Sequence, residues 1–138
     1  MSGVPPVGPA MPVSATVQHD HAERGERRLG LVLTVGRDSV PAELLLPLEP
    51  RPAPAALLLH GAGSHKGTMS DTAGRSLLAR GVASLAIDLP MHGARSEGLD
   101  MGALSNPIEL VRRWRGALAD VAASIDFLAG HPDVDRSR

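Results

Sequence analysis

Apolar positions before residue 90 of this 138-residue chain fall into short runs, whereas those after residue 106 recur with a helical period. The first two runs, residues 28–36 and 40–49, are rich in Leu and Val, and a short polar segment separates them. Runs of this length on either side of such a segment predict an antiparallel hairpin. The residues expected around its turn are Gly36, Arg37, Asp38 and Ser39.

Two further runs are apolar throughout. The prolines of segment 50–54 cannot continue a strand ladder, so residues 55–61 begin a new strand. Residues 82–90 form a second apolar strand, ended by Asp88 and Pro90. Strands without polar alternation are typical of a parallel sheet that is buried on both faces.

The segment between these two strands predicts a helix. Thr68 is expected as its N-cap with Asp71 at N3, a shortened capping box, and Gly81 as its C′ residue. The side chains expected to point inward are Ala73, Leu77 and Leu78. Strand, helix and strand within about 35 residues predict a βαβ unit with a right-handed crossover.

A longer helix is predicted after residue 106, with Asn106 as N-cap, Pro107 at N1 and Glu109 at N3. Apolar residues recur along it at spacings of 3, 4, 3, 4 and 3: Val111, Trp114, Leu118, Val121, Ile125 and Leu128. They form one apolar stripe of a helix of about 22 residues, which Gly130 and Pro132 close. His131, directly before Pro132, is expected only to end the helix.

Charged residues lie off this stripe, among them Arg112, Arg113 and Asp120, and Glu109 can pair with Arg113 one turn away. The basic segment 112–115 could contact an acidic partner. A solvated helix face is the favoured interpretation, because Trp114 between the arginines belongs to the apolar stripe.

Composition narrows the class of protein. The length is that of one domain or less, and 43% of the residues are apolar, enough for a core. A net charge of −1 and only two aromatic residues, Trp114 and Phe127, argue against nucleic-acid binding. The absence of cysteine excludes disulfides and thiolate metal ligands, and fits a reducing compartment.

Residues 1–27 are expected to be a disordered tail rich in Pro and Gly, and residues 28–138 to form the folded part. The tail has neither a basic n-region nor an unbroken apolar h-region. No stretch approaches the roughly 18 apolar residues of a membrane span. The expectation is a cytoplasmic protein without membrane contact.

The glycine-rich segment after the strand at 55–61 is the first candidate for chemistry. With Gly61, Gly63 and Gly67 before a helix and Asp88 at the end of the next strand, it is close to a dinucleotide-binding fingerprint. Against that interpretation, two antiparallel strands precede the loop, and the pattern G-x-G-x-x-x-G is loose. The P-loop pattern G-K-[ST] does not occur.

A second interpretation explains more residues. The segments His60-Gly61-Ala62-Gly63 and Asp88-Leu89-Pro90-Met91-His92-Gly93 with Ser96, in this order and after a hairpin, resemble the oxyanion motif and the D-x-P-x-H-G-x-x-S loop of the α/β-hydrolase superfamily. The resemblance spans residues 28–138 and is greatest to the dienelactone-hydrolase and serine-aminopeptidase-like branches. It favours a hydrolase over a dinucleotide-binding domain.

The resemblance implies an α/β fold, a mostly parallel sheet with an N-terminal antiparallel hairpin. It implies a serine hydrolase of esters, lactones or peptides that uses no metal and no organic cofactor. The backbone N–H of Ala62, or else that of Gly63, would stabilise the oxyanion, since fixed donors in a water-poor site lower the barrier. The residues that would support the two motifs are His60, Gly61, Asp88, His92, Gly93 and Ser96.

The sequence departs from the family in one respect. The family's nucleophile elbow G-x-S-x-G follows the next strand, and no such segment occurs here. The expected architecture is therefore truncated before the nucleophile strand, the chain carries no catalytic triad, and alone it should be inactive. A non-catalytic remnant of the fold stays an alternative. Residues 57–60 would lie at an exposed sheet edge, through which the chain could associate with another polypeptide.

Side chains of the loops offer two other chemistries. Ser64 beside His65 could form a Ser–His pair, but adjacent side chains in a loop rarely converge. A metal site could use His60, His65, Asp88 and His92, although the spacing matches no zinc pattern. Structural roles are favoured instead: His60 bonds backbone to fix its loop, Asp88 with His92 braces the following loop, and Ser96 stabilises a turn.

Overall fold

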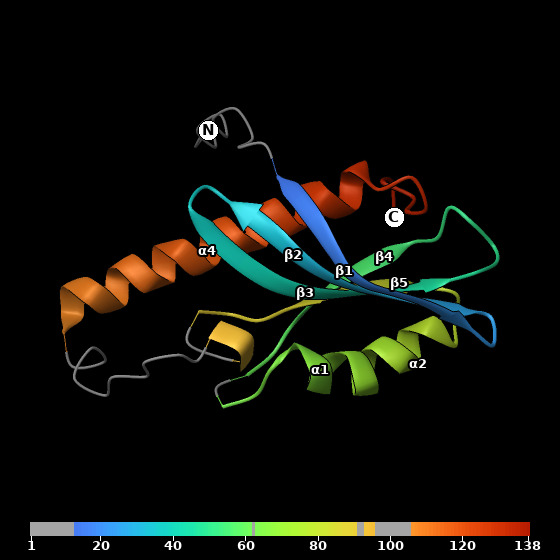
Figure 1. The fold of residues 1–138 in the computed structure, drawn as a ribbon, viewed down its shortest axis with the longest axis horizontal. Helices are drawn as coiled ribbons and strands as arrows, with labels where there is room; N and C mark the ends of the chain where they lie inside the picture. The colour runs from blue at the N-terminus through green and yellow to red at the C-terminus, as the bar shows by residue number, and fades with distance from the viewer. Residues whose placement is uncertain (1–12, 62, 91–92, 96–105) are drawn as a thin grey trace, which may run out of the picture.

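The chain folds into one mixed sheet with helices on both faces (Figure 1). The computed structural model describes residues 13–61, 63–90, 93–95 and 106–138. The sheet has five strands in the order β1-β2-β3-β5-β4. The strands are β1 (Ser14–Glu23), β2 (Glu26–Val35), β3 (Asp38–Pro47), β4 (Ala55–Leu59) and β5 (Ala83–Ile87).

The helical segments lie between β4 and β5 and after β5. The first is one run of α1 (Lys66–Met69), the π-helical turn η1 (Ser70–Gly74) and α2 (Arg75–Leu78). A 3₁₀ turn, η2 (Gly93–Arg95), and the long helix α4 (Pro107–Gly130) come later in the chain. No helix within the described residues is both long and apolar enough to cross a membrane.

The predicted hairpin is confirmed: β2 and β3 pair antiparallel from Glu26–Pro47 to Val35–Asp38, which leaves a two-residue turn. Its first turn residue, Gly36, has a φ of 61°. This left-handed conformation is one that glycine adopts at little cost, and tight hairpin turns require it.

The expected tail boundary at residue 27 is wrong, because residues 14–23 form strand β1 and pair antiparallel with β2. Every residue of β1 is exposed. Backbone hydrogen bonds and the Arg27–Asp20 ion pair hold the strand. It buries no side chain, so it leaves no alternation of apolar and polar residues to detect. Residues 1–12 of the expected tail lie outside the described residues.

Alternate residues of β2 and β3 form the main core on the face toward α4. Because side chains of a strand point to opposite faces in turn, every second residue shares this face. The buried residues there are Leu29, Leu31, Leu33, Val40, Ala42, Leu44 and Leu46, joined by Leu85 and Ile87 of β5. Leu128 and Val134 pack against them from the other layer.

The βαβ unit is confirmed in outline, since β4 and β5 pair in parallel through five residue pairs. Its helix begins differently from the prediction. His65, not Thr68, is the N-cap, and its Nδ1 accepts a hydrogen bond from the N–H of Gly67. Asp71 is no capping residue either, because its carboxylate pairs with Arg28 at 3.2 Å.

Small residues bring this helical run close to the sheet. Ser70 and Gly74 are buried, whereas Ala73, Leu77 and Leu78 are only half-buried. A Cβ atom on Gly74 would lie 3.1 Å from both Leu45 Cδ1 and Ser84 Oγ. The run ends as predicted, since Gly81 has a φ of 74° and its N–H donates to the carbonyl of Leu78.

Helix α4 has the predicted ends but not the orientation that its apolar stripe favours. Asn106 Oδ1 accepts hydrogen bonds from the N–H groups of Ile108 and Glu109, and the predicted Glu109–Arg113 pair forms at 3.2 Å. The stripe, however, faces solvent: Val111, Trp114, Leu118 and Ile125 are 53, 70, 56 and 52% exposed. Only Leu128, at its end, is buried.

The opposite side of α4 lies on the sheet and is made of small and polar residues. Asp120, Ala123 and Ser124 are buried there, so Asp120, which lies off the apolar stripe as expected, faces the sheet and not solvent. Small side chains let the helix approach the strands closely. The hydrogen bond from Ser124 Oγ to the carbonyl of Asp120 satisfies a hydroxyl within the helix.

Strand β4 lies at the edge of the sheet, as the sequence predicts for residues 57–60. Residues 133–138 run beside its beginning: the N–H of Ala53 donates to Asp133, and that of Ala55 donates to Arg138. Leu59, at the end of β4, is 43% exposed. The sheet is mixed rather than mostly parallel, because among the described strands only β4 and β5 pair in parallel.

Candidate functional site

Loops at the carboxyl ends of β4 and β5 form the candidate site. Residues 60–65 follow β4, and residues 88–95 follow β5. Because the two strands are parallel neighbours, both loops emerge at the same edge of the sheet. Ala62, His92 and Ser96, all expected to belong to the site, lie outside the described residues.

His60 ties the two loops together. It is 5% exposed, and its Nε2 lies 3.0 Å from the backbone nitrogen of Leu89, whose N–H donates to it. An accepting Nε2 leaves the proton on Nδ1, which lies 2.8 Å from the carbonyl oxygen of Gly61. These two hydrogen bonds are to backbone and join the two loops, which agrees with the structural role favoured for His60.

Asp88 is the second tie. Its side chain is fully buried, and Oδ1 accepts a hydrogen bond of 2.8 Å from the N–H of Lys66. Oδ2 accepts from Lys66 Nζ at 2.9 Å and from the N–H of Ala94 at 3.0 Å. Burial alone would raise the pKa of Asp88, but the hydrogen bonds and charge of Lys66 and the bond from Ala94 lower it. Asp88 thus braces its loop as an anion.

A side chain at position 93 would be strained. Gly93 has a φ of 54°, and a Cβ atom there would overlap the Asp88 carboxylate. The missing side chain lets the backbone of η2 close over the carboxylate, which places the N–H of Ala94 on Oδ2.

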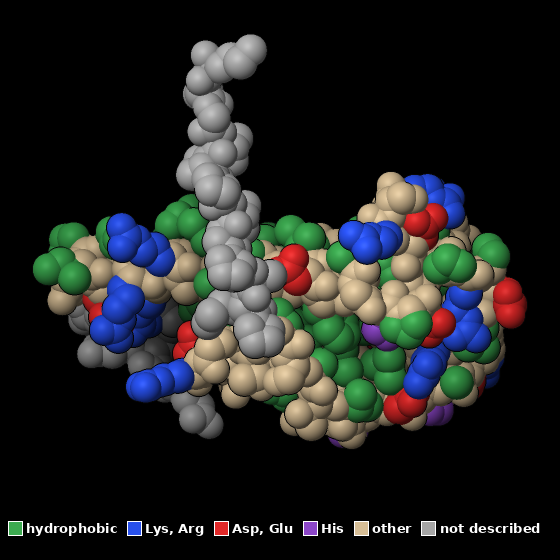
Figure 2. Space-filling model, turned by 90° about the horizontal axis from the view of Figure 1, so that it is seen from above, with side chains coloured by type: hydrophobic (Ala, Val, Ile, Leu, Met, Phe, Trp, Pro, Cys, Tyr) green, Lys and Arg blue, Asp and Glu red, His purple; other side chains and the backbone are tan. Residues whose placement is uncertain are grey.

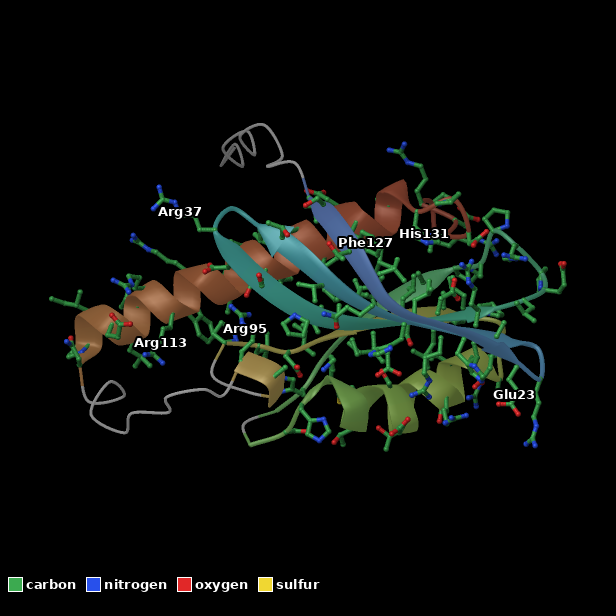
Figure 3. The ribbon with its side chains drawn as sticks, in the orientation of Figure 1. Glu23, Arg37, Arg95, Arg113, Phe127 and His131 are labelled. Carbon is green, nitrogen blue, oxygen red and sulfur yellow. The ribbon has the colours of Figure 1, made fainter. Side chains whose placement is uncertain are left out.

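Arg95 fastens the same loop to α4 (Figure 3). Its Nη1 lies 3.2 Å from the carbonyl oxygen of Asp88 and 2.6 Å from Asp120 Oδ2. Burial raises the pKa of Asp120, the Arg95 guanidinium opposes that rise, and the charge of Asp38 adds to it. This pair was not predicted from the sequence. The signal available for it was Asp120, a carboxylate on the side of α4 opposite the apolar stripe.

The glycine loop itself is open toward solvent. Gly61 and Gly63 are exposed, and a Cβ atom on either would meet nothing within 4 Å among the described atoms. Gly63 has a φ of 77°, and the N–H of Ser64 closes a short turn onto the carbonyl of Gly61. The turn is fixed at both ends, by His60 and by the bonds between Lys66 and Asp88.

The other chemistries considered for these loops fit less well. His65 acts as a helix cap and contacts Thr68 Oγ1 at 3.3 Å, so it is occupied away from Ser64. Within the described residues, no group of three or more His, Cys, Asp or Glu could hold a metal ion. Asp88 is buried and bonded to Lys66, which removes the exposed acid that a ribose hydroxyl would need.

His131 stands where the sequence places it, as the residue that ends α4. Its Nδ1 accepts from the N–H of Asp133 at 3.2 Å, and its ring meets the edge of Phe127 with centroids 5.8 Å apart (Figure 3). Burial lowers the pKa of His131. It is a structural residue far along the chain from both loops.

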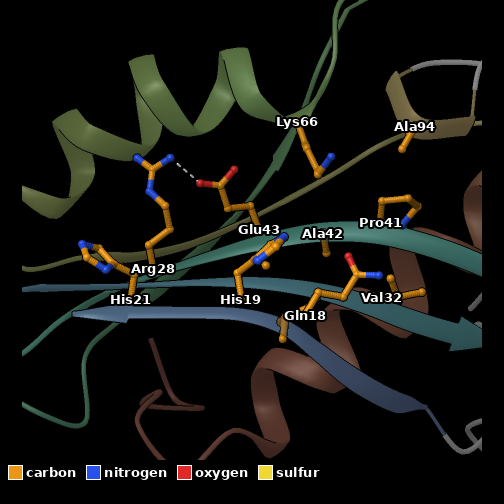
Figure 4. A pocket seen from close by; sticks show the side chains of 12 residues that line it. Gln18, His19, His21, Arg28, Val32, Pro41, Ala42, Glu43, Lys66 and Ala94 are labelled. Carbon is orange, nitrogen blue, oxygen red and sulfur yellow. Dashed lines mark ion pairs between the residues drawn. The ribbon is translucent and has the colours of Figure 1, made fainter. Parts of the chain in front are cut away.

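A cavity of about 460 Å³ lies beside Lys66 and Ala94, the two residues that donate hydrogen bonds to Asp88 (Figure 4). Lys66 and Ala94 form one wall, and strands β1 to β3 form the floor. Arg28 and Glu43 are paired at one end, near His19 and His21 of β1. No described residue of the glycine loop lines it.

Solved structures resemble this arrangement. An esterase from an Arctic intertidal metagenomic library is 28% identical, with a TM-score of 0.64 over 84% of this chain and 50% of its own. Acetyl xylan esterase 1 of Thermoanaerobacterium is 18% identical, with a TM-score of 0.69 over 91% of this chain and 43% of its own. A Bacteroides fragilis protein assigned as an acetyl xylan esterase is 15% identical, with a TM-score of 0.77 over 91% of this chain and 40% of its own.

The chain has the fold of the N-terminal half of α/β-hydrolase esterases. It spans 40 to 50% of the length of these three structures. No protein-family model matches the sequence, and the search of curated proteins gave no match. The branch of the α/β-hydrolase superfamily stays a prediction.

Proposed function

We propose that this chain is the N-terminal part of a serine hydrolase that acts on ester, lactone or peptide bonds, and that it supplies the oxyanion-hole loop. The observation that carries the proposal is the double anchoring of the glycine loop. At the beginning of the loop, His60 accepts a hydrogen bond from the backbone N–H of Leu89. At the end of the loop, Asp88 accepts one from the backbone N–H of Lys66.

Anchoring matters because of what an oxyanion hole requires. Attack on a carbonyl creates a negative oxygen, and N–H donors lower its energy most when they need no rearrangement. In this proposal the N–H of Ala62 is the donor, with that of Gly63 as the alternative. Among the described atoms, the space beside Gly61 and Gly63 is open, which would leave room for a substrate carbonyl.

The reaction needs groups that this sequence does not contain in the family's pattern. The nucleophile elbow G-x-S-x-G is absent from the 138 residues. Nucleophile, general base and orienting acid would therefore come from a further half of the domain. Ester substrates are favoured within the proposed range, because the matched structures are esterases.

A chimera tests the donor role. Residues 13–138 would replace the matching half of the Arctic metagenomic esterase, and hydrolysis of p-nitrophenyl acetate would be measured after circular dichroism has shown a folded protein. In that chimera, Ala62→Pro removes one N–H, and Ala62→Ser keeps it as the matched control. We expect kcat to fall about 10²- to 10³-fold for Ala62→Pro and to change little for Ala62→Ser.

Two results would refute the proposal. One is a folded chimera in which Ala62→Pro and Gly63→Pro both keep full kcat, because neither N–H would then stabilise the oxyanion. The other is a folded chimera that binds the ester substrate but does not hydrolyse it. That outcome would favour a non-catalytic remnant of the fold.

A further inference from the structure

One peptide unit in the loop after β5 is held by a side chain at each end. The carbonyl of Asp88 and the N–H of Leu89 belong to this planar unit. Arg95 Nη1 donates to the carbonyl at 3.2 Å, and the N–H donates to His60 Nε2 at 3.0 Å. The guanidinium of Arg95 is therefore connected to the imidazole of His60 through a single peptide group.

A second peptide unit, in the glycine loop, begins with the carbonyl of Gly61. His60 Nδ1 lies 2.8 Å from this oxygen and donates to it, because Nε2 accepts and leaves the proton on Nδ1. The N–H of Ser64 donates to the same oxygen at 3.1 Å. The N–H of this peptide unit is that of Ala62, the proposed oxyanion donor. Two hydrogen bonds thus hold the carbonyl end of the group that carries the proposed donor.

These hydrogen bonds all run in one direction. Arg95 donates to a carbonyl, the N–H of that peptide donates to His60, and His60 donates to the next carbonyl. A carbonyl that accepts a hydrogen bond is polarised, which makes the N–H of the same peptide a stronger donor, so bonds in such a chain strengthen one another. We call this chain of bonds, from Arg95 to the carbonyl of Gly61, the relay.

The relay starts at a buried ion pair. Asp120 is 1% exposed, and its Oδ2 accepts from Arg95 Nη1 at 2.6 Å. The same nitrogen thus donates to this carboxylate and to the carbonyl of Asp88. Asp120 lies on the sheet side of α4, away from the outer side, where apolar side chains and arginines lie together along the N-terminal half of the helix (Figure 2). Asp120 therefore balances the charge of Arg95 and holds it in place inside the protein.

We infer that Arg95 is a positioning residue for the oxyanion loop, which acts through the relay on the N–H of Ala62. Arg95 fixes and polarises the first peptide unit of the relay, and His60 passes both effects to the second. The catalytic consequence rests on the proposed function, whereas the relay itself does not.

A role limited to fastening the loop after β5 onto α4 is the competing explanation for Arg95. In that case, removing the guanidinium would move the loop as a whole, and its effect on Ala62 would not depend on His60. The relay predicts the opposite: the effect passes through His60 and disappears when the bonds of His60 are cut. The two explanations therefore differ in how substitutions at positions 95 and 60 combine.

Nuclear magnetic resonance of the full 138-residue chain, labelled with ¹⁵N, tests the relay without catalysis. Spectra of the imidazole nitrogens should show the proton of His60 on Nδ1. The amide ¹⁵N resonance of Ala62 reports the polarisation of its own peptide unit. We expect this resonance to move upfield when the relay loses Arg95, because a less polarised peptide shields its nitrogen more.

Arg95→Met combined with Asp120→Leu removes the start of the relay and leaves no buried charge without a partner. The matched control is Arg113→Met combined with Glu109→Leu, which removes an ion pair of 3.2 Å from the same helix and leaves the relay intact. We expect the amide resonance of Ala62 to move several times further in the first variant than in the control. Circular dichroism checks that both variants are folded.

His60→Asn tests the route. Asparagine keeps a donor near the position of Nδ1 but has no acceptor at the position of Nε2, so it cuts the relay at Leu89. Adding Arg95→Met and Asp120→Leu to this variant should leave the amide resonance of Ala62 unchanged, because residues that act through one another are not additive. If His60→Asn does not fold, His60→Gln takes its place, since glutamine reaches Leu89 but offers no donor at the position of Nδ1.

Kinetics of the chimera described above measure the consequence for catalysis. For Arg95→Met with Asp120→Leu, we expect kcat on p-nitrophenyl acetate to fall about three- to tenfold, because the donor N–H is weakened and not removed. KM should change by less than about twofold, since the relay acts on the oxyanion and not on substrate binding. The Arg113 and Glu109 control should leave both constants within about twofold of the unchanged chimera.

The inference is overturned if the proton of His60 lies on Nε2, or if the resonance of Ala62 moves no further than in the control. It is also overturned if Arg95→Met with Asp120→Leu has its full effect in the His60→Asn background. A folded but inactive chimera refutes the proposed function, and the spectra alone then decide the inference. An active chimera that keeps its kcat without Arg95 and Asp120 refutes the inference and leaves the proposed function standing.

Discussion

Asp88 joins three segments of the chain through one carboxylate. It is the last residue before the loop after β5, and it accepts hydrogen bonds from Lys66 at the start of α1 and from Ala94 in η2. A buried carboxylate is costly unless it is paired and hydrogen-bonded, and here both conditions hold. Its lowered pKa shows that the folded state favours the charged form.

Asp88→Asn should lower the free energy of unfolding by about 1–3 kcal/mol at pH 7, because the amide cannot accept from all three donors. The folded-state pKa lies below the unfolded value, so the stabilisation is present above about pH 4 and is lost as the pH falls through the folded-state pKa. Urea unfolding between pH 7 and pH 2.5 should therefore show the difference between wild type and Asp88→Asn shrinking with acidity. A difference that does not vary with pH would contradict this.

Gly93→Ala should destabilise the protein by about 2–4 kcal/mol, because it adds backbone strain at positive φ and a clash with the Asp88 carboxylate. Gly25→Ala is the matched control: Gly25 also has a positive φ, 87°, but a Cβ there meets nothing within 4 Å. It should cost only about 1 kcal/mol. Urea unfolding measures both, and equal losses would exclude the clash.

At the level of single residues, the sequence indicated which positions belong to the site but not which residues they contact. Asp88 and Gly93 were predicted from the resemblance of their loop to a family motif. Lys66, 22 residues before Asp88, carried no local signal, because its role exists only when two loops meet at the sheet edge. His65 instead of Thr68 as N-cap was missed because histidine is not among the residues that usually cap helices.

Among the secondary-structure elements, α4 shows which properties a local pattern can predict. Its ends were correctly predicted, because capping by Asn106 and termination at Gly130 depend on neighbouring residues alone. Its rotation was not, because it depends on contacts with the sheet. Asp120 is buried with Arg95, and the small residues Ala123 and Ser124 are buried against the strands. The apolar stripe therefore faces outward.

Removing one partner of the Arg95–Asp120 pair should destabilise the protein more than replacing both partners. Arg95→Met leaves Asp120 buried without its partner and should cost about 3–5 kcal/mol at pH 7, whereas Arg95→Met with Asp120→Leu should cost much less. The pKa of Asp120 is already raised by burial. Its protonation removes the uncompensated charge, so the cost of Arg95→Met should decrease as the pH falls. Thermal unfolding at pH 7 and pH 4 tests this, and a larger cost at pH 4 would contradict it.

For the molecule as a whole, two motifs in the right order were enough to predict the fold of the N-terminal half of an α/β-hydrolase. They could not predict the mixed character of the sheet. Strand β1 is exposed along its whole length, and only its backbone joins the ladder. A strand that buries no side chains is invisible to any method that reads apolar periodicity.

The same architecture argues against a dinucleotide site. Asp88 is sealed by Lys66 and Ala94, and three antiparallel strands precede the glycine loop. We therefore expect no shift in melting temperature at millimolar NAD or NADP, because only a ligand that binds the folded state raises it. A saturable rise that Gly63→Val abolishes would restore the dinucleotide interpretation.

The last prediction concerns catalysis by the chain alone. Efficient acyl transfer needs a nucleophile, a base within hydrogen-bond reach of it and a group that orients the base. At the glycine loop the described residues supply Ser64 and His65, but His65 accepts from Gly67 as a helix cap, and His60 is bonded to backbone on both nitrogens. An oxyanion donor without a positioned nucleophile and base supplies only a small part of an enzyme's rate enhancement. Purified chain should therefore hydrolyse p-nitrophenyl acetate no faster than a heat-denatured sample of equal concentration. His65→Ala is the decisive control: turnover that survives purification and disappears in this variant would make the loop itself a catalyst.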